Sequence, residues 1–158
     1  MATWLRMAEA RPEMEARARE LYLIEQPDAP GPAGLGYLAT VRADGGPRVH
    51  PVSPAVIDGR LYIYVLLSSP KLRDLQGDGR YALHSWPKPF TDDGFDDEEF
   101  YLTGRAAAVD SDELHRRVSA AVGDKPESGA SFELDIERAM HKARAGGLGY
   151  TVWRADAS

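Results

Sequence analysis

The sequence predicts a single, mainly β domain in which six or seven antiparallel strands form a closed barrel with short flanking helices. Hydrophobic residues alternate with polar ones in several short segments after residue 36, and turn-forming pairs such as Asp58-Gly59 separate those segments. The chain has 158 residues, which is enough for one well-packed domain and too few for two. A β-sandwich fits the same pattern nearly as well, because hairpins of short strands build both architectures.

Residues 1–32 are predicted to be a helical segment followed by a linker, and residues 33–158 form the barrel. Hydrophobic residues recur at helical spacing in the N-terminal segment, and Pro12 suits the first turn of a helix because its missing N–H is not needed there. The proline-rich run 27–32 cannot continue a helix, so the helical segment ends before it.

The first predicted hairpin joins a strand that begins at Gly36 to a returning strand over 48–57, with a turn at 44–46. Pro51 and Pro54 lie within the returning strand, and each lacks the N–H that a central strand would use. We therefore expect this strand to be an edge strand or to be bulged at these points.

The clearest strand covers 60–67 and precedes a short helix with Ser69 as N-cap and Pro70 in its first turn. Further strands are predicted over 80–86, over 100–109 with a bulge at Gly104, near 132–136 and over 149–154. An acidic loop covers 87–98. Asp110 and Glu113 have the spacing of a capping box ahead of another helix, which Gly123 closes.

Composition excludes several classes of function. The net charge of −6 and the absence of a long basic run argue against nucleic acid as a partner. No cysteine is present, which excludes disulfides and thiolate chemistry. The four histidines are far apart in sequence and have no ligand spacing, so no metal site is predicted; His115 and His141 are expected to face solvent. We find neither a signal peptide nor an apolar run long enough to span a membrane, and expect a cytoplasmic protein.

A candidate anion site lies where the strand over 60–67 leads into the short helix. Ser69 supplies a hydroxyl and Lys71 an ammonium group beside the free N–H groups of a helix start, where the helix dipole is positive. A simple capped helix with a solvated lysine explains the same residues about equally well.

Several segments carry a more specific pattern. They are 35–42, 44–52, 58–64, 69–75, 80–83 and 98–106. In this order they resemble the flavin-binding split-barrel family related to pyridoxamine 5′-phosphate oxidase, and the match covers roughly residues 33–122. The strand near Tyr150–Arg154 fits more loosely. The resemblance implies an antiparallel split β-barrel that pairs into a homodimer with a flavin in the interface cleft.

The resemblance also implies roles for individual residues. Arg48, Ser69 and Lys71 match the positions that clamp the phosphate of FMN. The positions that pass along the flavin ring and ribityl chain with their backbone are Val49, His50, Pro51, Tyr64 and Val65. Pro70 replaces a second cation that is common in the family. The segment 150–156 lacks the histidine with which true pyridoxamine phosphate oxidases grip their substrate, so that activity is not expected.

The leading interpretation is therefore an FMN-binding oxidoreductase that acts on an unidentified small-molecule substrate, with no catalytic residue assigned. A deazaflavin coenzyme would seek the same cations. A non-catalytic protein that binds flavin or haem is a further alternative, and haem would require His50 or His84 as its axial ligand. The fourth hypothesis is that the ligand site has been lost and only the dimeric barrel remains.

Overall fold

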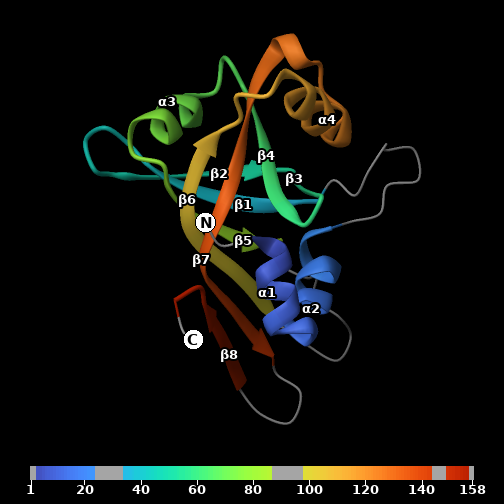
Figure 1. Cartoon of the computed structure of the whole chain (residues 1–158). Coiled ribbons are helices and arrows are strands. Elements are labelled where there is room, and N and C mark those ends of the chain that lie inside the picture. The colour runs from blue at the N-terminus through green and yellow to red at the C-terminus, as the bar shows by residue number, and fades with distance from the viewer. Residues whose placement is uncertain (1–2, 24–33, 87–97, 144–148, 157–158) are drawn as a thin grey trace, which may run out of the picture.

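The computed structural model describes residues 3–23, 34–86, 98–143 and 149–156 (Figure 1). The predicted proline-rich linker over 27–32 and nearly all of the acidic loop predicted over 87–98 lie outside these ranges. Within them, no helix is both long and apolar enough to cross a membrane.

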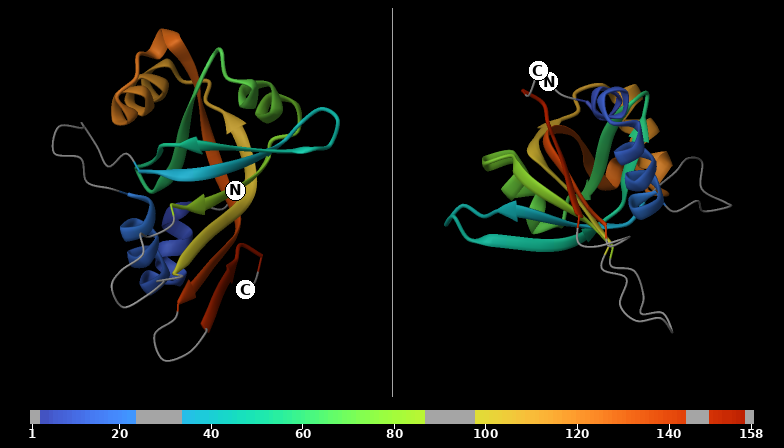
Figure 2. Two further views of the ribbon diagram at one scale, coloured as in Figure 1. Left: turned by 180° about the vertical axis from the view of Figure 1, so that it is seen from behind. Right: turned by 90° about the horizontal axis from the view of Figure 1, so that it is seen from below.

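Two helices precede the sheet, as predicted. α1 covers Trp4–Ala10, and Pro12 begins α2, which covers Pro12–Tyr22. Both helices pack on the barrel through buried side chains, and they lie together at one end of the molecule (Figure 2). Tyr22 is fully buried, and its hydroxyl lies 2.7 Å from the carbonyl oxygens of Leu83 and of Phe100. α2 is thereby joined to two neighbouring strands of the sheet.

All eight strands among the described residues form one antiparallel sheet. Their bounds are β1 Gly36–Val41, β2 Pro47–Val52, β3 Pro54–Ile57, β4 Arg60–Leu66, β5 Arg80–Ser85, β6 Glu99–Ala108, β7 Gly129–Ala143 and β8 Gly149–Arg154. Along the sheet the order is β2-β1-β5-β6-β7-β4-β3, and β8 pairs with β7. The predicted bulge at Gly104 is confirmed, because the register of β6 against β7 shifts between Thr103 and Gly104.

The two ends of this sheet are consecutive in the chain. β2 lies at one end and β3 at the other, and Ser53 alone separates them. The sheet must therefore curve round on itself until its ends meet, which produces the barrel (Figure 1). The strand predicted over 48–57 is interrupted at Ser53, and Pro51 and Pro54 lie on the two strands at the ends of the sheet order, as predicted for residues that lack an N–H.

Two helices cover the same end of the barrel, on either side of the upper parts of β4 and β7 (Figure 1). α3 covers Pro70–Gly77 and α4 covers Asp112–Val122, and a short 3₁₀ turn follows at Pro126–Ser128. The predicted capping box of Asp110 and Glu113 was wrong, because the N-cap lies one residue later and the third helical residue is then Leu114, which has no carboxylate. Ser111 is the N-cap of α4, and its hydroxyl accepts a hydrogen bond from the Leu114 N–H. Gly123 ends α4 in the left-handed conformation, as predicted.

β4 is buried on both faces, which explains why its sequence is almost continuously apolar. One face contributes Leu61, Ile63 and Val65 to the main core. The other face packs Tyr62 and Tyr64 against Val118 of α4. The strand that carries part of the predicted site is therefore held from both sides.

The two histidines expected to face solvent are partly buried. His141 lies on β7, where its Nε2 donates to Glu98 at 2.8 Å, and the side chain is only 12% exposed. His115 of α4 bonds the Pro126 carbonyl and the Ser131 hydroxyl. The expectation was wrong because both side chains find polar partners on neighbouring elements.

Candidate functional site

A pocket of about 240 Å³ lies between the start of α3 and the end of α4. The connection between β2 and β3 and the end of β4 complete its wall. The lining residues are Leu35, Pro51, Val52, Ser53, Tyr64, Leu66, Ser69, Lys71, Val122 and Asp124. Four residues predicted from the sequence thus meet in one place, namely Pro51, Tyr64, Ser69 and Lys71.

Lys71 is held at the pocket wall. Its Nζ donates a hydrogen bond of 3.0 Å to the Pro51 carbonyl on β2, so the side chain reaches across from α3 to the edge of the sheet. Partial burial of the ammonium group lowers its pKa from the usual value. A partly desolvated cation in a pocket binds an anion more strongly than an exposed one, because water competes less.

Ser69 occupies the N-cap position of α3, but its hydroxyl makes no capping hydrogen bond to the helix. Ser69 is therefore not explained as a simple cap, the alternative that the sequence left open. Because it lines the same pocket as Lys71, its hydroxyl can donate to an anion there. The positive end of the α3 dipole favours the same charge.

Arg48 lies beside α3 but is not part of the pocket lining. Its Nε donates to Asp74 Oδ2 at 2.7 Å, and the Thr40 hydroxyl donates to the same oxygen at 2.7 Å. Asp74 is buried, so this ion pair is shielded from water. Sequence analysis did not identify Asp74, since a single acidic residue in a short helix gives no signal of burial. Among the described residues the Nη1 and Nη2 groups of Arg48 have no hydrogen-bond partner, so they can donate to a further acceptor.

The side chains of β2 alternate between two environments. Val49 and Pro51 are exposed, whereas Arg48 and His50 are partly covered. Val65 on β4 is completely buried, so only its backbone is available to a ligand. Four predicted site residues do not line the pocket, although each is close in sequence to a residue that does. They are Arg48, Val49, His50 and Val65.

Tyr64 forms a rigid part of the wall. Its hydroxyl donates to the Lys125 carbonyl at 2.5 Å, and its ring stacks on that of His115 at a centroid distance of 6.0 Å. Burial, followed by the negative charges of Asp124 and Glu127, raises the pKa of the Tyr64 phenol. Tyr64 is thus a neutral aromatic surface for a ligand.

The pocket residues that sequence analysis missed come mainly from two places. Val52 and Ser53 lie where β2 leads into β3, and Val122 and Asp124 lie at the end of α4. Only the three-dimensional arrangement brings α4 to this pocket, so no local pattern signals these residues. The described residues contain no group of three or more His, Asp or Glu side chains placed to hold a metal ion.

The curved antiparallel sheet, with a pocket that contains Lys71 beside the junction of β2 and β3, defines the class as a split-barrel protein. The sequence model of the family described as pyridoxamine 5′-phosphate oxidase matches residues 30–143. The chain therefore belongs to this family, and the resemblance predicted from the sequence is confirmed. No curated protein matches the chain.

Solved structures share the fold at low sequence identity. A haem-binding protein from Mycobacterium smegmatis has a TM-score of 0.59 and 20% identity, over 74% of this chain and 52% of that one. This chain thus spans about half the length of that protein. A conserved hypothetical protein from Mycobacterium tuberculosis has a TM-score of 0.60 and 20% identity, over 89% and 98% of the two chains. A protein related to general stress protein 26, from Clostridium acetobutylicum, has a TM-score of 0.60 and 11% identity over 96% of each chain.

Proposed function

We propose that this protein is an FMN-binding oxidoreductase that acts on a small-molecule substrate. The observation that carries the proposal is the pairing of Ser69 and Lys71 at the start of α3 in the wall of one pocket. A hydroxyl without a capping bond and a half-buried ammonium group suit a phosphate. Arg48 supplies a further cation at the neighbouring edge of α3.

A bound flavin supplies the redox chemistry, and the protein residues bind and orient it. Ser69, Lys71 and Arg48 hold the phosphate in this proposal. The backbone of Val49, His50, Pro51 and Val65, together with Tyr64, follows the rest of the cofactor. No residue of the pocket is assigned to proton transfer.

We also propose that the working form is a homodimer. The pocket, at about 240 Å³, is smaller than the roughly 300–1,000 Å³ of typical ligand sites, so one subunit encloses only part of the cofactor. Large apolar side chains are exposed close to it in sequence: Val49 is 61%, Leu66 45% and Leu67 60% exposed. A second subunit would cover these side chains and complete the cleft.

The experiment is an absorbance titration of the purified protein with FMN, accompanied by light scattering. We expect one FMN per subunit of a dimer, and a loss of affinity of about tenfold or more in Lys71→Ala, because a charge-assisted hydrogen bond is removed. Arg116→Ala is the matched control, since it removes one positive charge from an exposed position on α4. Unchanged FMN affinity in Lys71→Ala would refute the proposed clamp.

A deazaflavin coenzyme fits the same cations and belongs in the same titration. If only the deazaflavin binds tightly, the site is assigned to that cofactor and the roles of Ser69 and Lys71 stand. If neither binds, the oxidoreductase proposal fails.

Haem binding is a second candidate, favoured by the geometry of His84. Its Nδ1 lies 2.7 Å from the Ser85 carbonyl, which can only accept, so Nδ1 donates there, and the other ring nitrogen, Nε2, lies 3.9 Å from the Glu99 carboxylate. The side chain is 43% exposed and its ring stacks on Tyr101. A haem arm of the titration decides: a haem absorption band that disappears in His84→Ala supports this candidate, and His50→Ala tests the other histidine.

A further inference from the structure

The end of the pocket formed by α4 carries a negative charge that the proposed cofactor clamp does not use. Asp124 lines the pocket immediately after Gly123, the residue that ends α4. The last turn of α4 contains no basic residue, so the negative end of its dipole is not compensated from within the helix. A carboxylate at this position adds a second negative charge, which is unfavourable unless a cation approaches.

Among the described residues no cation is paired with Asp124, although the exposed Lys125 follows it in sequence. Asp124 forms no ion pair with any described residue, and the other charged residue of the pocket, Lys71, donates to the Pro51 carbonyl. After burial, the negative charges of Asp124 and Glu127 contribute to raising the pKa of the neighbouring Tyr64 phenol. Among the residues that line the pocket, the α4 end thus carries a carboxylate, Asp124, whereas the α3 end carries an ammonium group, Lys71.

We propose that this α4 end of the pocket binds a positively charged group, an amidinium, guanidinium or ammonium, of the molecule that reacts with the cofactor. Asp124 is then a specificity-determining residue that accepts hydrogen bonds from the cation. The aromatic ring of Tyr64, held by its hydrogen bond to the Lys125 carbonyl and by stacking on the His115 ring, provides a flat wall beside it. The inference rests on the proposed function only where it calls the bound molecule a substrate.

The opposite charges of the two ends also fix an orientation. A phosphate placed near Asp124 would meet a carboxylate and the negative end of α4, whereas at Ser69 and Lys71 it meets a hydroxyl and an ammonium group. The anionic group of the cofactor therefore belongs at the α3 end. A cationic substrate belongs at the α4 end, and an anionic substrate of similar shape is rejected there.

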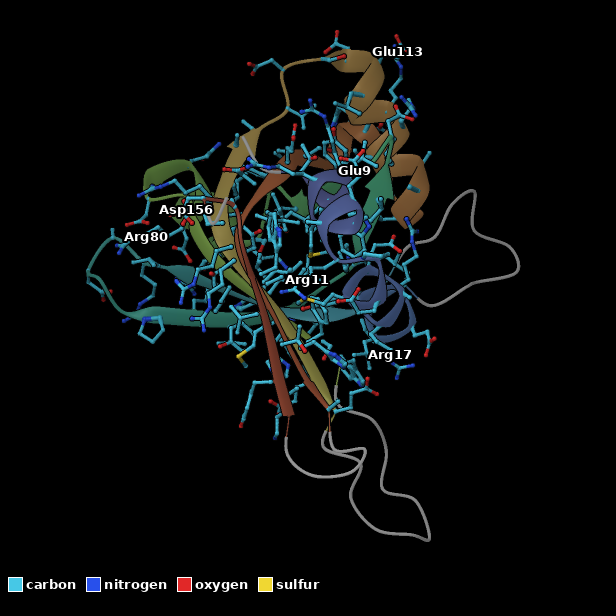
Figure 3. All side chains as sticks on the ribbon, turned by 60° about the horizontal axis from the view of Figure 1, so that its bottom comes forward. Glu9, Arg11, Arg17, Arg80, Glu113 and Asp156 are labelled. Atoms are coloured by element: carbon cyan, nitrogen blue, oxygen red, sulfur yellow. The ribbon has the colours of Figure 1, made fainter. Side chains whose placement is uncertain are left out.

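Ligand-observed NMR with benzamidine and benzamide tests this inference. The two probes have the same shape, but only benzamidine is charged. In the native protein we expect benzamidine to bind about tenfold more tightly than benzamide, with a preference that decreases as salt is added. Asp124→Asn should abolish the preference. Asp156→Asn, which removes the same charge from an exposed position near the C-terminus (Figure 3), should leave it unchanged.

Each variant is measured with and without FMN, and its FMN affinity is determined in parallel. Equal binding of the two probes to the native protein overturns the inference, and so does a preference that persists in Asp124→Asn. If FMN does not bind but the preference depends on Asp124, the proposed function fails and the cation site stands. If FMN binds to every variant and the preference is absent, the inference alone fails.

Discussion

Replacing Glu98 by glutamine should weaken the attachment of α2 to the barrel. Glu98 lies just before β6 with only 9% of its side chain exposed. It accepts hydrogen bonds from Arg17 of α2 at 2.7 and 2.5 Å and from His141 of β7 at 2.8 Å. All three contacts come from donors, so the amide nitrogen of a glutamine must face at least one of them.

The expected cost follows from these contacts. Losing a hydrogen bond to a charged group costs about 1.5–3 kcal/mol, and partial exposure of Arg17 moves the expectation to about 2 kcal/mol. For a chain of this size the melting temperature should fall by about 4–8 °C. Urea unfolding at neutral pH measures the change in the free energy of unfolding.

Glu20→Gln is the matched control. Glu20 also binds Arg17, but its side chain is 63% exposed, and Figure 3 shows Arg17 at the surface of the α2 side. This variant should change the free energy of unfolding by no more than about 0.5 kcal/mol. If the two variants cost the same, burial of the carboxylate does not determine the strength of this contact, and the reasoning is refuted.

Two further changes test the pocket wall and the acid range. In Gly129→Ala the new Cβ would lie 2.4 Å from Tyr64 Cζ and 2.5 Å from the Val65 carbonyl oxygen. We expect the free energy of unfolding, measured in urea, to fall by about 1–3 kcal/mol and the affinity for FMN to decrease. No change in either quantity would contradict this expectation. Asp78 bonds Arg80, which holds the pKa of Asp78 at about 2 against the usual 3.8. The ionised Asp78 therefore contributes its full stabilisation above pH 3.8, and this stabilisation is lost as the pH falls toward 2. The difference in unfolding free energy between the native protein and Asp78→Asn should shrink over that range. A constant difference would disprove the assignment.

Local patterns predicted most of the strands. β1 and β8 were found within a residue of their bounds, since alternating side chains and glycine turns are read directly from neighbouring residues. The cap of α4 was displaced because Asp110 and Ser111 are both good N-caps, and only the Ser111 contact with Leu114 distinguishes them.

The candidate site was predicted only where it is local. Ser69 and Lys71 are two residues apart on one turn, so a sequence motif contains them. Asp74 and Asp124 were missed, because their importance depends on α3 meeting β2 and on α4 reaching the pocket. The family resemblance supplied Arg48, but it did not reveal that Asp74 already binds this arginine.

The junction at Ser53 has a consequence for how the barrel holds its shape. Pro51, Val52 and Ser53 line the pocket, so the place where the sheet closes on itself is also the place where a ligand would lie. A ligand that contacts both this junction and α3 would therefore stabilise the closed arrangement of β2 and β3. Binding of a ligand would then slow amide hydrogen exchange in both β2 and β3. These two strands lie at opposite ends of the sheet order, so the effect would not be expected from strand pairing alone.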